Sequence, residues 1–581
     1  MRNLWLQIIN FFRNLWYGLR SLRSLRRAQI PQILESFSKK EFYTLITALL
    51  VIVLGGGFLV IQTFSKKGPG PHSGGELVEG LVGQPQFINP VLGLNSGVDT
   101  DISRVVYAQL LKFDADRNLV ADLAEKLPDV SADQKTYTLN LKSDLKWQDG
   151  KPLNADDVIF TIQTIQNADF ESPLRPNWTR VKVEKIDDLT LTFQLREVSV
   201  SFMNNFAVGI IPKHIWDGQT PRNFRFSDSN LKPIGAGPYS VREIKKTSDG
   251  TIKSITLRAN PNYYQGPPYI TTLTFRFYDD YDGLINAYQG KEIQSLGYVP
   301  FDKNAFLNEN DKMNQYRVSL PQYQAVFFNL SKNPVLAEKS VRQALWLVTD
   351  RNQIIQGVYN GNAAAAYGPI LPGSLGYDAN IEKNAHVSLD EANAILDKAG
   401  WVVDAETKIR VKNKKSLEFN LVLSGHLVLN VKIAQILENQ WEQLGAKVNL
   451  VVVGPNELET QYIRPRSFDA LLFSENVGAD PDPFPFWHGT QIHDPGLNLS
   501  GFVNAEADKL LTDARQTSDP ALRIKNYLRF QEIINTELPA IFLARSLYIY
   551  NVPKKVGGIE LQDIVSPSER FLDINHWYFG N

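Results

Sequence analysis

The sequence SFDALLFSENVGADPDPFPFWHGTQ, residues 467–491, joins a short apolar run to a proline-rich loop. Polar residues bound the apolar run at residues 470–473, which is typical of a buried strand. Gly478 and three prolines then follow within residues 478–485. Because proline fixes φ and removes a hydrogen-bond donor, neither a helix nor an inner strand is expected to continue there. The stretch therefore predicts a strand that ends in a stiff loop.

This loop places carboxylates beside large aromatic side chains. The acids are Glu475, Asp480 and Asp482, and their neighbours are Phe484, Phe486, Trp487 and His488. Acids and aromatics at the C-terminal end of a strand are suited to a cleft that holds a cationic, partly apolar ligand. A surface turn over a small satellite hydrophobic cluster is the alternative interpretation.

Length and composition limit the class of protein. The chain has 581 residues, too many for one hydrophobic core, and roughly three to four domains are expected. Its 61 lysine and arginine residues balance 62 aspartate and glutamate residues, so the formal net charge is −1. Because basic residues cluster only near the N-terminus, a nucleic-acid partner is not expected. The sequence has no cysteine, which excludes a disulfide framework, a thiol nucleophile and a lipid-modified cysteine anchor.

The first 75 residues predict an attachment to a membrane. Residues 1–41 are basic and aromatic with apolar residues at helical spacing, which predicts a cytoplasmic amphipathic segment; a disordered basic tail is the alternative. Residues 42–62 carry no charge and are long enough to span a bilayer. Positive charge on their N-terminal side predicts a single-pass cell-membrane anchor with the main domain outside. A cleaved signal peptide is the competing interpretation. Residues 63–75 are expected to be a Gly/Pro-rich linker.

Strands and helices alternate through the rest of the chain. Apolar periodicity predicts a strand at residues 417–423, an amphipathic helix at 431–444 and a strand at 448–453. This order implies parallel pairing and α/β layers. Residues 136–141 predict a strand, and Asn154 is expected to cap the next helix.

Four further elements and one turn are expected. The elements are a helix at residues 99–111, a helix at 341–348 capped by Ser340, and two strands at 541–542 and 547–550. Gly235 and Gly237 lie in a turn and would allow two backbone segments to approach closely.

A search for catalytic and metal-binding motifs finds none with standard spacing. His488, His493 and Asp494 are the one possible metal cluster, but their spacing matches no standard site. Ordinary cleft or surface histidines are the preferred interpretation. No catalytic residue, metal ligand or cofactor is therefore predicted.

Several stretches, taken together, carry a family resemblance. They are residues 83–90 (GQPQFINP), Tyr107, 123–127 (LAEKL), 137–141 (YTLNL), 147–160 (WQDGKPLNADDVIF), 233–239 (PIGAGPY), 341–345 (VRQAL), 398–401 (KAGW) and 480–482 (DPD). The chain resembles the peptide-binding, family 5 class of extracellular solute-binding proteins, the dipeptide and oligopeptide receptors of ABC importers. The resemblance covers about residues 76–581. The W-x-D-G-x-P-x-x-A-x-D-V-x-F run and the G-x-G-P-Y run are specific in combination.

The resemblance implies a two-lobed α/β periplasmic-binding-protein fold that closes on its ligand, preceded here by the N-terminal transmembrane helix. Lobe I would comprise residues 76–328 and the return segment 541–581, and lobe II residues 329–540. Two crossover strands, near residues 325–329 and 540–544, would form the hinge.

The resemblance also implies the site. Family members pair a carboxylate with the α-ammonium group of an extended peptide, and that aspartate lies just ahead of the DPD run. Here the place is taken by residues 474–479, in which Glu475 is the only acid. Either Glu475 substitutes, or Asp480 binds the ammonium group, or the ligand has no free amine. The implied ligand-binding residues are Glu475, Asp480, Asp482, Trp487, Tyr107 and Asn95. Arg342, Gly235 and Gly237 are expected to be structural.

The leading hypothesis is a membrane-tethered monomer that captures oligopeptides and delivers them to an ABC permease. Relatives on the same scaffold take nickel complexes, haem or short sugars, so another solute is an alternative. A ligand sensor that signals through the membrane helix is a second class of function. A hydrolase is a third class, which no motif supports.

Overall fold

The computed structural model describes most of the chain after residue 70. The described residues are Ser38, 71–93, 96–304, 312–383, 385–426 and 428–580. Apart from Ser38, the predicted amphipathic segment 1–41 lies outside this set, as do the predicted membrane span 42–62 and Asn95. No helix within the described ranges combines the length and the apolar character that crossing a membrane requires.

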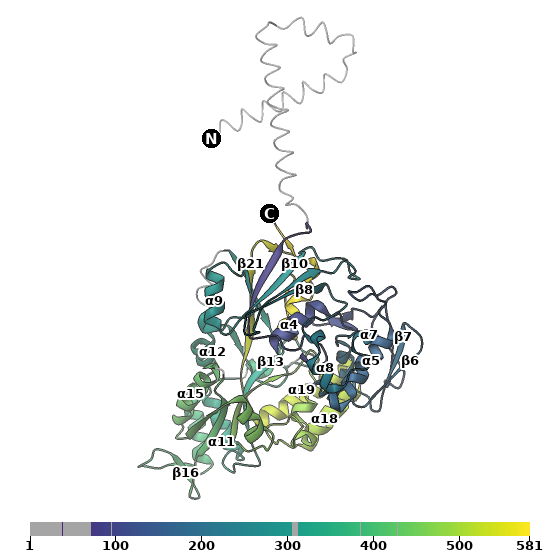
Figure 1. Cartoon of the computed structure of the whole chain (residues 1–581). Coiled ribbons are helices and arrows are strands. Elements are labelled where there is room, and N and C mark those ends of the chain that lie inside the picture. The colour runs from purple at the N-terminus through teal and green to yellow at the C-terminus, as the bar shows by residue number, and fades with distance from the viewer. Residues whose placement is uncertain are drawn as a thin grey trace. The chain divides into compact units, whose positions relative to one another are not determined.

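Strands from distant parts of the chain form one twelve-stranded sheet (Figure 1). Ten strands follow one another in the order β19-β18-β20-β13-β21-β11-β1-β10-β9-β8, and β12 and β14 pair with β21. Their bounds are β1 Glu76–Val82, β8 Tyr239–Lys246, β9 Ile252–Ala259, β10 Thr272–Tyr278, β11 Ser295–Leu296, β12 Met313–Ser319, β13 Gln322–Phe328, β14 Ala363–Ala365, β18 Glu418–Ser424, β19 Lys447–Val453, β20 Ala470–Asn476 and β21 Ala540–Pro553.

The predicted strand–helix–strand unit is confirmed. Helix α15 (Val428–Glu442) connects β18 to β19, and these two strands pair in parallel. The pairing follows from the amphipathic helix, which must return over the sheet to bury its apolar side.

Four hydrophobic cores pack around the sheet in the described part of the chain, and the three largest take their residues from different helices. The first core joins β1 and β8–β10 to α4 (Gly97–Val106) and α5 (Ala155–Gln166). It also includes the four-stranded sheet β4-β5-β7-β6, whose strands are β4 Asp129–Val130, β5 Thr136–Asn140, β6 Val181–Lys185 and β7 Thr190–Leu195. The predicted strand at 136–141 and the Asn154 cap of α5 are both confirmed.

The second and third cores lie on opposite faces of β13, β18 and β20. Alternate residues of β13 divide between them: Val326 packs in the second core and Phe327 in the third. The second core is covered by helices α11 (Lys339–Val348), α12 (Arg351–Tyr359), α14 (Leu389–Lys398) and α15. The third core is covered by α18 (Ala505–Gln516) and α19 (Pro520–Glu537), which Figure 1 shows on the other side of these strands from α11 and α15.

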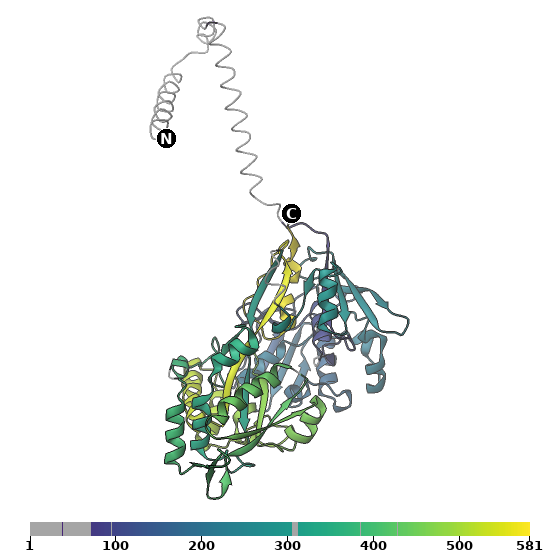
Figure 2. The same ribbon diagram turned by 90° about the vertical axis from the view of Figure 1, so that its left-hand side faces the viewer.

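Two stretches that pass between the first core and the other two concern the cleft, although Phe301 and Ile549 also pack in the second core. One lies between Leu320 in the first core and Tyr323 in the third, and the other between Ala544 in the second and Tyr548 in the first. Strand β21 pairs with β12 on one side of this crossing and with β13 on the other. Figure 2 shows the C-terminal part of the chain, in yellow, running down through the molecule. The resemblance implied hinge strands near residues 325–329 and 540–544. Residues 325–328 and 540–544 lie inside the sheet, between the second and third cores.

The G-x-G-P-Y and W-x-D-G runs hold the backbone of residues 235–239 close to the end of α4 at Val106. A Cβ atom on Gly235 would lie 2.0 Å from the carbonyl oxygen of Val106, so only glycine fits. The side-chain amide of Gln148 donates to the carbonyl oxygens of Val106 (3.1 Å) and Tyr239 (2.6 Å), and its oxygen accepts from the Gly235 amide (3.0 Å). The predicted close approach of the backbone is confirmed.

Several predicted boundaries were wrong. Helix α4 ends at Val106, not at 111, and Glu338, not Ser340, precedes α11. The two strands expected at 541–542 and 547–550 are one continuous strand, β21, because both parts find neighbours in the sheet. The stiff loop after β20 contains a one-turn helix, α17 (Phe484–Trp487), because proline is tolerated in the first turn of a helix.

The remaining α-helices and strands of the described residues are short. They are β2 Leu111–Phe113, β3 Leu119–Ala121, α6 Arg175–Trp178, α7 Lys213–Trp216, α8 Pro221–Phe226, α9 Tyr281–Gln289, α13 Ala379–Lys383, β15 Val402–Val403, β16 Arg410–Lys412, β17 Lys415–Ser416, α16 Pro455–Glu457, β22 Val556–Gly557 and β23 Tyr578–Phe579.

Candidate functional site

A cavity of about 730 Å³ lies between two parts of the chain that are far apart in sequence. One side, which we call the first wall, consists of lining residues within 176–181 and 195–205, around α6 and the 3₁₀ helix η5 (Val200–Phe206). The other side, the second wall, consists of lining residues within 476–490 and 512–516, from the loop after β20, α17 and the end of α18. Its volume is in the range of sites that bind small molecules.

A second cavity, of about 470 Å³, lies where the chain passes between the cores. Its lining includes Leu320 and Gln322 from one crossing and Ser546 and Leu547 from the other. Asn476, the last residue of β20, lines both cavities. We call the two cavities together the cleft.

An ionic cluster fixes one side of the second cavity. Arg570 binds both carboxylate oxygens of Asp101, at 2.8 and 2.6 Å, and its Nη2 also donates to Glu79 Oε1 at 2.6 Å. Tyr550 and Ser295 donate hydroxyl hydrogen bonds to the other oxygen of Glu79, at 2.6 and 3.0 Å. The cluster connects β1, α4 and the C-terminal 3₁₀ helix η10 (Pro567–Phe571) in the first core.

Asp480 and Asp482 both line the first cavity, and arginine neutralises each of them. Asp480 Oδ1 lies 2.6 Å from Arg523 Nη2, and Asp482 Oδ2 lies 3.0 Å from Arg515 Nε. Burial raises the pKa of Asp482, and the Arg515 guanidinium and the Ser201 hydroxyl oppose that rise. The acid-bearing loop therefore does not present free negative charge to the cavity, contrary to the expectation of a cation-attracting loop.

A hydrogen bond joins the two walls directly. The hydroxyl group of Ser201, on η5, donates to Asp482 Oδ2 at 3.1 Å. The same carboxylate accepts from the backbone amide of Phe484 at 3.3 Å through its other oxygen. Asp482 is thus held by groups from both walls.

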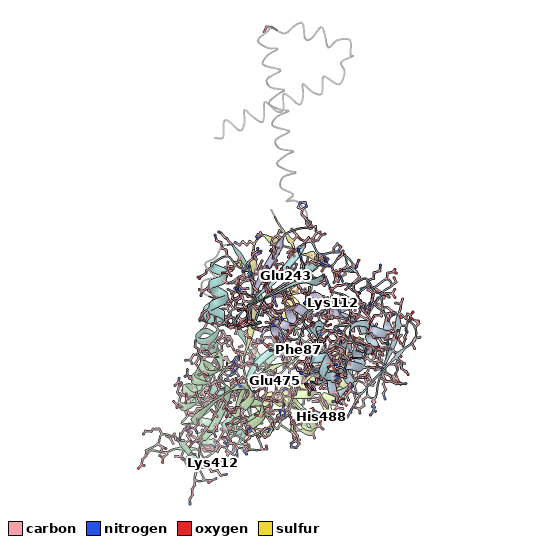
Figure 3. The ribbon with its side chains drawn as sticks, viewed as in Figure 1. Phe87, Lys112, Glu243, Lys412, Glu475 and His488 are labelled. Atoms are coloured by element: carbon pink, nitrogen blue, oxygen red, sulfur yellow. The ribbon has the colours of Figure 1, made fainter. Side chains whose placement is uncertain are left out.

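Glu475 and His488, which are labelled in Figure 3, differ in their position relative to the cleft. Glu475 lies on β20 and lines neither cavity. Its side chain is buried, accepts a hydrogen bond from the Tyr323 hydroxyl and has its other oxygen without a partner. His488 lines the first cavity, where its ring stacks on Phe484 with 4.1 Å between the ring centroids.

The aromatic residues of α17 divide between cavity and core. Phe484 and Phe486 line the first cavity. Trp487 points the other way and is only 1% exposed, packed against Phe327 and Phe542 at centroid distances of 6.1 and 5.8 Å. The structure therefore places Trp487 in the third core and not at the cavity.

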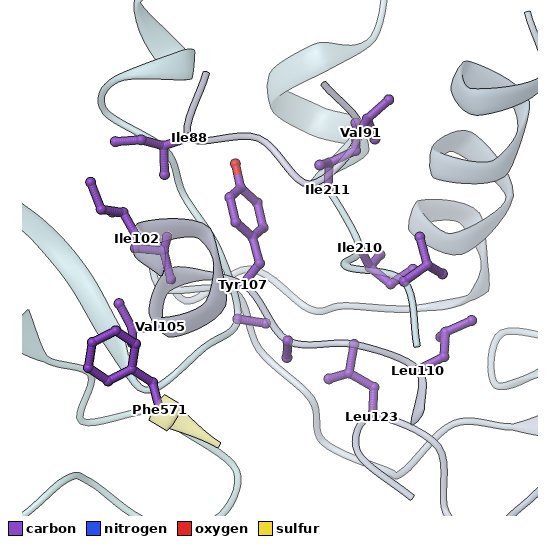
Figure 4. Packing of buried hydrophobic residues seen from close by; sticks show 14 of the residues in the cluster. Ile88, Val91, Ile102, Val105, Tyr107, Leu110, Leu123, Ile210, Ile211 and Phe571 are labelled. Carbon is purple, nitrogen blue, oxygen red and sulfur yellow. The ribbon is translucent and has the colours of Figure 1, made fainter. Parts of the chain in front are cut away.

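Tyr107 lies in the first core and lines neither cavity of the cleft. It packs among Ile88, Val91 and Ile211, as Figure 4 shows, and its hydroxyl group is buried without a hydrogen-bond partner among the described residues. It lines a separate cavity of about 240 Å³. The structure thus brings Asp480 and Asp482 together at the cleft, but it brings neither Glu475, Trp487 nor Tyr107 to it. Asn95 lies outside the described residues.

Sequence reasoning missed the first wall entirely. Arg180, Arg196 and Glu197 line the cavity there, together with Asn204 and Asn205. Arg180, Arg196 and Glu197 are exposed, and the two asparagines are half-buried. No periodicity or motif marks these polar residues, and only the fold brings them opposite the loop after β20. Among the described residues no group of three or more histidine, aspartate or glutamate side chains is arranged to hold a metal ion.

A family model and individual relatives both compare this chain with solute-binding proteins. Residues 118–494 match the bacterial extracellular solute-binding proteins, family 5 Middle. The oligopeptide-binding protein AppA of Bacillus subtilis is 29% identical over 526 residues, 89% of this chain and 94% of AppA. The dipeptide-binding protein of Escherichia coli is 26% identical over 514 residues, 82% of this chain and 90% of that protein.

Solved structures also resemble this chain. The structure of AppA in complex with a nonapeptide has a TM-score of 0.71 at 28% identity, and the match covers 88% of this chain and all of that one. The ABC transporter substrate-binding protein CtaP of Listeria monocytogenes has a TM-score of 0.75 at 27% identity, covering 87% of this chain and 99% of CtaP. The mixed α/β fold described above is therefore one that binding proteins of known structure share.

Proposed function

Because this chain belongs to the family 5 extracellular solute-binding proteins of bacteria, we propose that it captures oligopeptides in the cleft and delivers them to an ABC importer. The observation that carries the proposal is the cleft itself, bounded by two walls from distant parts of the chain. It is supported by two relatives, the oligopeptide-binding protein AppA and the dipeptide-binding protein of Escherichia coli.

The polar groups of the cleft suit a peptide backbone. The first cavity is lined by Asn177, Asn204, Asn205, Asn476 and Gln516. Each side-chain amide offers both donors and acceptors, which match the alternating N–H and C=O groups of an extended peptide. Water in a cavity of this size would bridge the remaining groups, so side chains of different shapes are accommodated. Affinity would then depend little on peptide sequence.

Binding is proposed to draw the two walls together. Strands that carry the chain between the cores would bend at the crossings near residues 320–323 and 544–548, because a few backbone torsions suffice for domain closure. The hydrogen bond between Ser201 and Asp482 would then stabilise the closed arrangement. In this scheme the cleft binds its ligand and releases it unchanged.

The protein is further proposed to be a monomer attached to the cell membrane by residues 42–62, with the ligand-binding part outside the cell. The uncharged length of that segment and the basic residues before it support this arrangement. Protease treatment of intact cells tests it: the part after residue 75 should be digested, and a tag placed before residue 41 should be protected. Digestion of both the tag and the part after residue 75, or of neither, would contradict the proposed orientation.

Titration with a mixed set of tri- to nonapeptides tests the function. Tryptophan fluorescence and thermal unfolding of the purified protein are followed as the peptides are added. Ligand at 100 times its dissociation constant should raise the free energy of unfolding by about 2.7 kcal/mol. A response to nickel chelates, haem or oligosaccharides, with none to peptides, would reassign the solute.

A further inference from the structure

We propose that the first wall selects peptides that carry net negative charge, through the guanidinium groups of Arg180 and Arg196. This inference rests on the proposed function, because it names the class of peptide that the cleft prefers. It reverses the expectation from the sequence, in which acids of the second wall would attract a cationic ligand.

The first step concerns the second wall, whose charges are already compensated. Asp480 pairs with Arg523, whose side chain is only 8% exposed, and Asp482 pairs with Arg515. Glu475, the acid nearest to them in the sequence, points into the third core and accepts a hydrogen bond from Tyr323. A ligand ammonium group at either acid would have to share the carboxylate with an arginine that lies within 3.0 Å, so its net electrostatic attraction is weak.

The second step concerns the first wall, whose charged side chains have no ion-pair partner among the described residues. Arg180 follows α6, and Arg196 follows β7, so both positions are fixed by elements packed in the first core. Both side chains are exposed and line the cavity, and neither makes an ion pair with a residue in the described ranges. Two guanidinium groups thus face a ligand directly.

The third step is the balance of free charge in the cavity. Glu197 also lines the first wall and has no ion-pair partner in the described part of the chain. Two free guanidinium groups against one free carboxylate leave the cavity with an excess of positive charge. Guanidinium groups bind carboxylates with two parallel hydrogen bonds, so acidic side chains or a free C-terminus would be favoured. Glu197 remains available for a single ammonium group.

The experiment uses the full-length protein and three N-acetylated, C-amidated hexapeptides. The peptides are identical except that alternate positions hold glutamate, glutamine or lysine, so only side-chain charge differs. Binding is measured by tryptophan fluorescence or calorimetry at about 50 mM and about 300 mM NaCl, because salt screens exposed charges. We expect the glutamate peptide to bind at least about ten-fold more tightly than the lysine peptide at low salt, and the ratio to shrink at high salt.

Variants assign the effect to the two arginines. Arg180→Gln and Arg196→Gln should each lower the glutamate-to-lysine ratio by roughly three-fold, and the double variant should bring it close to one. Arg222→Gln is the matched control, because Arg222 is exposed on α8 and lines neither cavity of the cleft. It should leave the ratio unchanged. Thermal unfolding of each variant checks that the fold is intact.

The outcomes separate this inference from the proposed function. Equal binding of the three peptides, tighter binding of the lysine peptide, or an unchanged ratio in the double variant would overturn charge selection while leaving peptide capture in place. Failure of every peptide, free or acetylated and of any charge, would overturn the proposed function and this inference with it.

Discussion

Glu475 on β20 lies directly opposite Tyr323 on β13, and its carboxyl group accepts a hydrogen bond from the tyrosine hydroxyl. Both side chains are buried, and the second carboxyl oxygen has no partner among the described residues. Burial raises the pKa of Glu475 from 4.5 to about 8, although the Tyr323 hydroxyl opposes the rise. The carboxyl group is therefore protonated at neutral pH, which avoids a buried, half-satisfied charge.

This pair predicts a pH dependence of stability. The folded protein keeps a proton that the unfolded chain releases above pH 4.5, so the free energy of unfolding should fall as the pH rises from 4.5 to about 8. The total loss is roughly 5 kcal/mol at most. Glu475→Gln, which cannot ionise, should flatten this part of the profile in denaturant unfolding measured from pH 5 to 9.

Glu457→Gln is the control for that experiment, because Glu457 is exposed. Its profile should follow that of the unchanged protein. A Glu475→Gln profile with the original slope would mean that another group is responsible for the pH dependence.

The contact between Ser201 and Asp482 predicts an effect on ligand release. Ser201→Ala removes the hydrogen bond between the walls, worth about 1 kcal/mol, so peptide should bind roughly five-fold more weakly. The change should be in the dissociation rate, measured by stopped-flow fluorescence, because the bond joins the two walls that the proposed closure draws together. Thr179→Val is the control: Thr179 lines the same cavity, but within the described residues its hydroxyl group donates only to the Arg175 carbonyl oxygen. An equal effect of both substitutions would argue against a role for the contact in closure.

The orientation of Glu475 could have been predicted from the sequence, whereas the first wall could not. Side chains of a strand alternate between its two faces, so Glu475 shares a face with Leu471 and Phe473, both of which pack in the third core. The predicted strand ended at Phe473, whereas β20 continues to Asn476, so the alternation of side chains was not extended to Glu475. Asn476 is the next residue and therefore points to the opposite face of the strand, where it lines the cleft.

Local sequence patterns correctly predicted individual strands, helices and helix caps. The period of residues 417–453 fixes β18, α15 and β19, and Asn154 caps α5 as expected. The pairing of Asp480 with Arg523, 43 residues later, depends on how α19 packs on the sheet. No local pattern carries that information, so the loss of free acid charge at the cleft was unforeseen.

The cluster of Arg570, Glu79 and Asp101 predicts a large loss of stability. Arg570→Met would leave two buried carboxylates without their cation, which should lower the free energy of unfolding by about 3–5 kcal/mol. Thermal unfolding and the yield of folded protein measure the loss. Arg529→Met is the control, because Arg529 pairs with Glu506 at the surface, and it should cost less than about 1 kcal/mol. Similar costs for the two variants would show that the cluster is not strongly coupled.

The approach of Gly235 to Val106 predicts that the G-x-G-P-Y run is required for the fold. In Gly235→Ala the new Cβ atom would lie 2.0 Å from the Val106 carbonyl oxygen, and backbone cannot move aside as a flexible side chain can. The close contact should lower the free energy of unfolding by about 3 kcal/mol or more in denaturant titrations. Gly454→Ala is the matched control, since its Cβ would meet nothing within 4 Å at an ordinary φ of −72°. Tolerance of alanine at both positions would mean that the two backbones can separate without loss, and that the run serves another purpose.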